Sequence, residues 1–159
     1  MIEIRSNSLA GGAIVDGNTV TGIAVPYNSS SVLLRDRPRP YRERFAPGAF
    51  PDIGEHVALF VGHDHRSLPL ARVGAGTLSF TESEEGLRFT ATLPDSRSDV
   101  LEAISRGDIG GVSIGFNSDE DDWTHRRSNQ PSDRLVTKAT LYELSLVTAG
   151  AYPKALFDS

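Results

Sequence analysis

The sequence predicts a mainly β domain of the α+β class, an antiparallel barrel or sandwich decorated by a few helices. Short stretches rich in β-branched and aromatic residues, bounded by Gly, Pro, Asn, Asp and Ser, fill the first ninety positions. One segment has a clear helical pattern, and the regular strand–helix alternation of a parallel sheet is missing. The length of 159 residues suits one core, so we expect a single domain over residues 1–159.

Five strands are expected before the helical segment. Their ranges are 19–26, 41–45, 56–61, 71–80 and 86–93. In the last range Leu87, Phe89 and Ala91 alternate with polar residues, which is the period-2 pattern of a strand with one solvent-facing side. The residues Glu84-Glu85-Gly86 before it indicate a hairpin turn.

A helix is predicted between Ser96 and Gly107. Ser96 with Asp99 gives a capping-box-like start, and Gly107 supplies the end. Three apolar residues fall on one helical face: Val100, Leu101 and Ile104. A second short helix is expected around residues 47–53.

Two more strands are expected after the helix, over residues 110–117 and 134–148. The second alternates residue types from Leu135 to Tyr142. The polar stretch 118–133 between them predicts a mobile loop that could shape a substrate groove.

Composition excludes several classes of protein. The chain has 16 Lys and Arg against 21 Asp and Glu, whereas a nucleic-acid binder needs a basic face. It has no cysteine, which excludes disulfides, thiolate zinc sites and a cysteine nucleophile. The longest apolar run, 57–62, is far short of the ~20 residues of a membrane span, and no signal-peptide pattern is visible. We therefore expect an intracellular protein with neither a nucleic acid nor a membrane as partner.

Charge is nevertheless distributed unevenly. Five arginines lie between Arg35 and Arg44, and Asp119 begins a run of four acidic residues. Charge runs usually form solvated loops, and we expect that of both clusters. Docking of a peptide on the arginines is the alternative.

Ser113 lies in the pentapeptide Gly111-Val-Ser-Ile-Gly115, which matches G-x-S-x-G. An α/β-hydrolase has a helix after this motif, whereas here the expected helix precedes it, so the hydrolase interpretation fails. A serine between glycines permits close approach of a substrate backbone and could leave N–H groups free for an oxyanion. A buried strand serine is the alternative.

His63 and His65 are two positions apart, so on a strand both side chains would project to the same face. An H-x-H pair with a carboxylate can hold a metal, as in cupin-like barrels, but no glutamate follows shortly downstream. A purely structural histidine pair is the default interpretation.

Glu143 lies in an otherwise mostly apolar strand, Leu141-Tyr-Glu-Leu-Ser-Leu-Val147. An unpaired buried carboxylate is costly, so Glu143 either faces solvent or has a buried partner. A histidine partner would have its tautomer fixed and its imidazolium stabilised by the carboxylate.

Five motifs in this order resemble the prohead (capsid maturation) proteases of tailed phages, a family similar in fold to herpesvirus assemblin. The motifs are Phe45-Ala-Pro-Gly-Ala-Phe50, Gly62-His63-Asp64, Gly86-Leu87, Gly111-Val-Ser-Ile-Gly-Phe116 and Glu143-Leu-Ser-Leu-Val-Thr148. The resemblance extends over residues 45–153. After the last motif the family usually has a Pro-Ala-Asn-Pro-like run, from which this chain departs with Ala149-Gly-Ala-Tyr-Pro153.

The resemblance implies a serine endopeptidase on a small antiparallel β-barrel flanked by a few helices. It places the nucleophile at Ser113, the base at His63 within a His-Asp pair, and the acidic member at Glu143. His65 is followed by the cation Arg66, which would disfavour imidazolium, so His63 is the expected base. No metal and no organic cofactor are implied.

By the same resemblance, the substrates are the scaffold and the scaffolding segment of the major capsid protein, and the enzyme also cleaves itself. It would act inside the procapsid in the bacterial cytoplasm, with self-association as a further possibility. A non-catalytic capsid-assembly module on the same fold is the alternative from another functional class. A cupin-like metal-binding barrel comes third.

Overall fold

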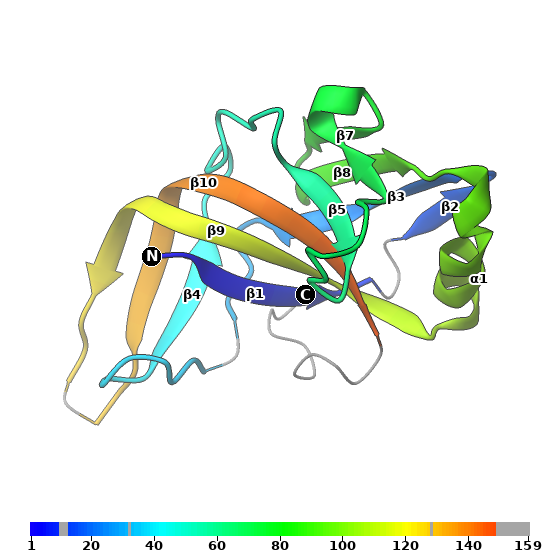
Figure 1. Cartoon of the computed structure of the whole chain (residues 1–159). Coiled ribbons are helices and arrows are strands. Elements are labelled where there is room, and N and C mark those ends of the chain that lie inside the picture. Colours follow the sequence, from blue (N-terminus) through cyan, green and yellow to red (C-terminus); the bar gives the residue numbers. More distant parts are fainter. Residues whose placement is uncertain (10–12, 32, 128, 149–159) are drawn as a thin grey trace.

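Two β-sheets of different size make up most of the structure, a computed structural model that describes residues 1–9, 13–31, 33–127 and 129–148 (Figure 1). The larger sheet has the order β1 (Glu3–Ser8), β9 (Ile109–Thr124), β10 (Ser132–Thr148), β5 (Ala58–Val61) and β6 (Ala71–Arg72), with β4 (Tyr41–Phe45) also paired to β10. The smaller sheet has the order β2 (Ile14–Asp16), β3 (Thr19–Pro26), β8 (Gly86–Thr92) and β7 (Leu78–Glu82). The predicted mainly β class is confirmed.

The long strands β9 and β10 form the framework of the larger sheet (Figure 1). They are antiparallel, and their register places Ser145 opposite Ser113 and Glu143 opposite Gly115. On its other side β10 pairs in parallel with β4 near its start and with β5 near its end. Strand β1 pairs with the free side of β9, with Ser6 opposite Ser113.

The hydrophobic core contains side chains from both sheets and from the helix. Phe45 and Phe116 of the larger sheet meet edge to face with ring centroids 5.2 Å apart, and Phe89 of the smaller sheet is fully buried in the same cluster. Val100 and Leu101 add the apolar face of the helix. Each such side chain stabilises the fold by about 1.5–3 kcal/mol relative to leaving it exposed.

A single α-helix, α1 (Ser98–Arg106), is present in the described part of the chain. Its end is as predicted, since Gly107 has a φ of 84° and donates its N–H to the carbonyl of Ile104. Its start differs from the prediction, because a 3₁₀ turn (Asp95–Arg97) that contains Ser96 precedes the helix. No side chain caps the first turn of the helix. This helix is too short to cross a membrane, and the described ranges contain no longer one.

Several predicted boundaries are wrong. Residues 47–53 form a turn and extended chain in place of a helix, with the Ala49 N–H bonded to the carbonyl of Ala46. The predicted strand 71–80 is split into β6, a 3₁₀ turn (Val73–Ala75) and β7, because Gly76 turns the chain with a φ of 74°. Strand β5 begins two residues later than expected.

The predicted barrel also needs correction. Neither sheet of the described residues closes on itself, and β10 has two parallel partners in a sheet expected to be antiparallel throughout. Long connections separate β4 and β5 from β10, and connections of this length permit parallel pairing. Local sequence patterns do not indicate in which direction strands so far apart in the chain will pair. The likeness in fold to herpesvirus assemblin stays a prediction.

The polar stretch 118–133, expected as a loop, is mostly strand. Strand β9 continues through the acidic run to Thr124, and β10 begins at Ser132. The pairing is reinforced by a 2.6 Å hydrogen bond from Thr140 Oγ1 to Asp119 Oδ2. Polar side chains lie on both faces of this end of the hairpin, so the apolar alternation that predicts a strand is missing. Within the arginine cluster, Arg42 and Arg44 are likewise exposed residues of β4 and not of a loop.

Four buried charged residues join β1, β4 and β10, and no sequence pattern singled them out. Glu43 accepts hydrogen bonds from Arg5 at 2.8 Å and from Arg134 at 2.9 Å. Arg134 also donates to both carboxylate oxygens of Glu3, at 2.9 and 3.0 Å. Burial by itself raises the pKa of Glu3, but the hydrogen bond and charge of Arg134, with Arg5, lower that pKa below its usual value. This network links β1 to β4 and β10 through buried side chains.

Candidate active site

Strand β9 holds Ser113 at the centre of the larger sheet, between β1 and β10. In the register of these strands Ser6, Ser113 and Ser145 lie side by side on one face of the sheet. The Ser113 side chain is almost fully buried, at 1% exposure. It lies on a central strand, so its position is set by pairing on both sides.

A tight turn after β5 carries His63 back over the sheet. Gly62 and His63 both have left-handed backbones, with φ of 59° and 57°. The Gly62 N–H donates to the carbonyl of Leu146 at 2.8 Å, and the His63 N–H donates to Ser145 Oγ at 2.9 Å. Strand β5 therefore ends at Val61, as predicted, and His63 lies in the turn that follows it, so the common strand face considered for His63 and His65 does not arise.

The three residues singled out by sequence are joined by two hydrogen bonds. His63 Nε2 lies 2.9 Å from Ser113 Oγ, and His63 Nδ1 lies 2.7 Å from Glu143 Oε1. The ionised carboxylate can only accept, so Nδ1 carries the proton and Nε2 is the acceptor for the serine hydroxyl. This order of groups suits a serine whose proton is removed by an oriented histidine.

Gly115 makes room for the Glu143 side chain. A Cβ atom on residue 115 would lie 3.0 Å from Glu143 Cγ and 3.3 Å from Glu143 Oε1, closer than ordinary van der Waals contact. A shift of register between Leu141 and Glu143 in β10 accompanies this arrangement. The second glycine of G-x-S-x-G thus leaves the space in which the carboxylate lies over β9.

A comparison with protein families now bears on this geometry. The model of the caudovirus prohead serine protease family matches residues 2–158 of the 159-residue chain. The chain belongs to this family. Comparisons with curated proteins and with solved structures returned no match. The chain is thus a serine protease of phage capsid maturation. The departure at residues 149–153 lies outside the described residues.

His65 contacts the other oxygen of the protease's Glu143, which sequence reasoning missed. His65 Nε2 is hydrogen-bonded to Glu143 Oε2, and the Phe60 and His65 rings meet edge to face with their centroids 5.0 Å apart. The His65 side chain is 59% exposed, whereas that of Glu143 is 13% exposed. The only sequence signal was that His65 lies two positions after His63. The turn after β5 brings both imidazoles to the same carboxylate, and each forms a hydrogen bond with it.

Asp64, the other acidic residue near the protease's histidine, lies outside this hydrogen-bonded chain. Its carboxylate accepts hydrogen bonds from Ser67 Oγ at 2.7 Å and from the Arg66 N–H at 3.2 Å. These bonds, the one from Ser67 first, lower the pKa of Asp64 below its usual value. Asp64 therefore stabilises the turn.

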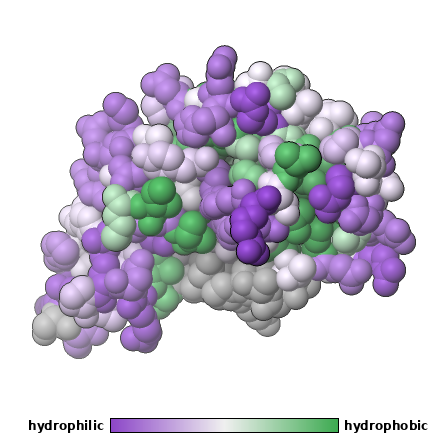
Figure 2. Space-filling model, viewed as in Figure 1, coloured by the Kyte–Doolittle hydropathy of each residue, from purple (hydrophilic) through white to green (hydrophobic). Residues whose placement is uncertain are grey.

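An apolar groove of about 440 Å³ adjoins the carboxylate of the protease. Its lining residues are Ile2, Ile4, Phe60, His65, Tyr142 and Glu143. Ile2, Ile4 and Tyr142 are large hydrophobic side chains that remain exposed. Figure 2 shows apolar side chains near the start of β1 and a second apolar area on the right of the same face, with hydrophilic side chains between and around them.

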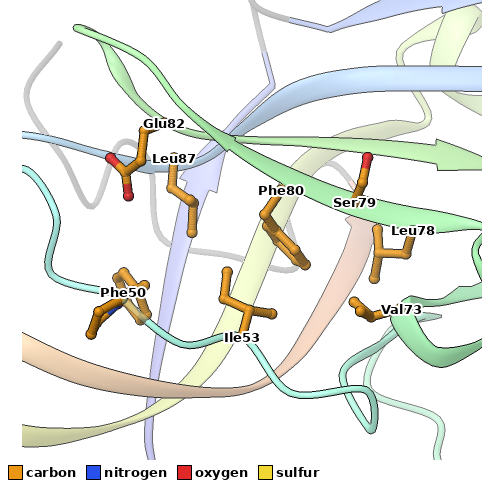
Figure 3. Close-up of a pocket in the computed structure, with 9 residues that line it drawn as sticks. Phe50, Ile53, Val73, Leu78, Ser79, Phe80, Glu82 and Leu87 are labelled. Atoms are coloured by element: carbon orange, nitrogen blue, oxygen red, sulfur yellow. The ribbon is translucent and has the colours of Figure 1, made fainter.

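A second pocket, of about 370 Å³, lies between β7, β8 and the segment that follows β4 (Figure 3). Phe50, Ile53 and Phe80 point into it, and Glu82 closes one end. Glu82 accepts a 2.8 Å hydrogen bond from the Tyr27 hydroxyl, whose pKa is raised by burial and by this bond. None of the pocket's lining residues belongs to the Ser113–His63–Glu143 group.

Three side chains of the protease could together hold a metal ion. Ligand atoms of His63, His65 and Glu143 all lie within 4.8 Å of one another. The carboxylate that the H-x-H pair lacked in the local sequence is thus supplied by β10. The same carboxylate bonds to His63 Nδ1, so such a site would overlap the Ser113–His63–Glu143 group.

Proposed function

We propose that this prohead protease is a serine endopeptidase with Ser113, His63 and Glu143 as its catalytic triad. The observation that carries the proposal is the continuous chain of hydrogen bonds from Ser113 Oγ through both ring nitrogens of His63 to Glu143. Ser113 lies on β9, Glu143 lies on β10, and His63 lies in the turn after β5. In the sequence, His63 is 50 positions from Ser113 and 80 positions from Glu143. Membership of a serine protease family supports the same assignment.

In this mechanism Ser113 Oγ attacks the carbonyl carbon of the scissile amide while His63 Nε2 takes its proton. The C–N bond then breaks, and Nε2 returns the proton to the leaving amine. Water hydrolyses the acyl-enzyme with His63 again as base. Glu143 keeps the proton on Nδ1 and stabilises the imidazolium that forms in each step.

Ser145 is a positioning residue in this proposal. Its hydroxyl accepts the backbone N–H of His63, and the neighbouring Leu146 carbonyl accepts that of Gly62. Strand β10 therefore holds the Gly62-His63 backbone with two hydrogen bonds, one from each residue, and the His63 ring with a third. Held geometry of this kind lowers the barrier, since a misplacement of 1 Å can cost about 10²-fold in rate.

We further propose that the substrates are the scaffold and the scaffolding segment of the major capsid protein, with cleavage of the enzyme itself. The enzyme would act inside the procapsid in the host cytoplasm. The apolar groove beside Glu143 suits an extended polypeptide with a bulky apolar side chain a few residues from the scissile bond. Family membership supports substrates of this kind.

The test is co-expression of the full chain with its capsid protein, followed by electrophoresis and mass spectrometry of the products. Ser113→Ala should abolish shortening of the capsid protein. Ser6→Ala is the matched control, because it removes a hydroxyl from the neighbouring strand at the paired position and should leave processing unchanged. Unchanged processing in Ser113→Ala would overturn the triad. If the capsid protein is not shortened by wild type or by either variant, the alternative of a non-catalytic assembly module is favoured.

A further inference from the structure

Two imidazoles and one carboxylate converge beside the nucleophile and face solvent on one side. Their ligand atoms lie within 4.8 Å of one another, and the His65 side chain is 59% exposed. Two histidines and one glutamate are a donor set that zinc accepts, with ligand distances of about 2.0–2.2 Å. Ligands around one such ion are therefore separated by at most about 4 Å. Small rotations of the exposed His65 ring would complete this geometry.

We propose that a divalent transition-metal ion of the zinc type binds to His65 Nε2, the Glu143 carboxylate and His63 Nδ1, and that it reversibly inhibits the protease. The binding part of this proposal rests on the three donor groups alone. The inhibitory effect rests on the proposed function, because it requires His63 to be the catalytic base.

Charge at this position favours a cation. Glu143 is hydrogen-bonded to the two histidines, and within the described ranges no lysine or arginine forms an ion pair with it. Arg66, which follows His65 in the sequence, is 97% exposed and pairs with Asp64 at 3.7 Å. Neutral imidazoles leave the carboxylate charge uncompensated, so an incoming ion meets no fixed positive charge that it must displace.

Binding at Nδ1 would stop His63 from acting as a base. The ion takes the Nδ1 lone pair, so the proton that this nitrogen carried leaves it. A neutral imidazole then has its single proton on Nε2, the nitrogen that lies 2.9 Å from Ser113 Oγ. Nε2 becomes a donor toward the serine and cannot accept its proton. The carboxylate, now a metal ligand, also ceases to stabilise imidazolium.

Binding is measured first on full-length Ser113→Ala, which needs no protease activity. Zinc is titrated by calorimetry and by competition with a chromogenic chelator, and we expect one ion per chain. His65→Gln in the same background should weaken zinc binding at least about tenfold. A loss of about tenfold is already typical when a residue that only orients a metal ligand is changed. His125→Gln, which changes an exposed histidine in the connection between β9 and β10, should leave the affinity unchanged. Mg²⁺ should not compete, because imidazole ligands suit zinc and not magnesium.

A spectroscopic readout separates this site from nonspecific binding. In protein with ¹⁵N-labelled histidine, zinc should move the Nδ1 signal of His63 and leave a protonated Nε2, together with a shift of His65. The proposal is overturned if these two rings do not respond. It is also overturned if His65→Gln binds zinc as tightly as His125→Gln does.

Inhibition is measured on active protein, with each variant normalised to its own metal-free rate. Zinc should inhibit the His125→Gln protein as it does wild type, and a chelator should restore the rate. His65→Gln should need at least about tenfold more zinc for half-inhibition. Equal zinc sensitivity in the two variants would overturn the proposal. Absence of any proteolysis in wild type would instead refute the proposed function, while the binding measurements would still decide the metal site.

Discussion

Replacing Glu143 by glutamine tests the acidic member and the role of His65 together. Glutamine keeps the shape but has one carbonyl oxygen and one amide nitrogen where Glu143 has two acceptors. Its oxygen can still accept from His63 Nδ1, provided that its NH₂ faces His65 Nε2 and that neutral His65 has its proton on Nδ1, so that Nε2 accepts. His65 therefore holds the amide in the orientation that preserves the productive tautomer of His63.

The expected loss can be worked out from this geometry. With the tautomer preserved, Glu143→Gln removes the charge that stabilises the His63 imidazolium. Unit charges about 4 Å apart at an effective dielectric constant of about 20 interact by about 4 kcal/mol, which corresponds to about 10³-fold in rate. In the His65→Ala background the amide is free to turn its NH₂ toward His63 and impose the wrong tautomer. The double variant should then fall about 10⁴-fold, the loss typical of a serine protease whose histidine has the wrong tautomer.

The assay is kcat/KM for cleavage of purified capsid protein by wild type, both single variants and the double variant. Circular dichroism shows whether each variant is folded, and labelling by a serine-directed phosphonate reports whether Ser113 still reacts as a nucleophile. Turnover near that of wild type in folded Glu143→Gln would remove Glu143 from the site. If His65→Ala lowers activity by the same factor in wild type and in the Glu143→Gln protein, the argument about amide orientation is refuted.

Three further outcomes are expected. Gly115→Ala should lower kcat about tenfold without unfolding the protein, because the new Cβ displaces Glu143 by a few tenths of an ångström; an unchanged kcat would contradict this. Glu3→Gln should lower the free energy of unfolding in urea at neutral pH by about 1–3 kcal/mol, because Arg134 loses one of its two buried carboxylate partners and keeps Glu43. The folded-state pKa of Glu3 is lowered, so this stabilisation is present above about pH 4.5 and is lost as the pH falls through the lowered pKa, and the variant should lack that part of the acid dependence. Tyr142→Ser should raise KM severalfold with little change in kcat, since it removes an exposed wall of the groove; equal KM values would exclude the groove from substrate binding.

Sequence patterns predicted the strands whose side chains alternate in burial. Strands β3 and β4 have the predicted bounds, and β8 ends one residue early, because each has one face in the core. The end of β9 escaped prediction because its pairing is polar on both faces. The buried ion network escaped too, because its members come from β1, β4 and β10 and only tertiary contact relates them.

The candidate site likewise has features that the local sequence predicted and features that depend on tertiary contact. Ser113, His63 and Glu143 were each singled out by motif, but their meeting depends on the β9–β10 register and on a left-handed turn. Neither is readable from local periodicity. The contact of His65 with Glu143 follows from that turn alone, so the sequence could suggest the pair of histidines but not their shared carboxylate.

The central position of β10 has a consequence for biosynthesis. Ser113 and His63 precede β10 in the chain, yet β10 lies between their strands and supplies Glu143 and the hydroxyl that holds the His63 backbone. A nascent chain that has not yet released residues 132–148 from the ribosome cannot pair β9 with β10 or β10 with β5. The hydrogen-bonded group therefore cannot assemble before these residues have emerged. Under the proposed function, a growing polypeptide on a polysome would have no complete triad until β10 has paired with both neighbouring strands.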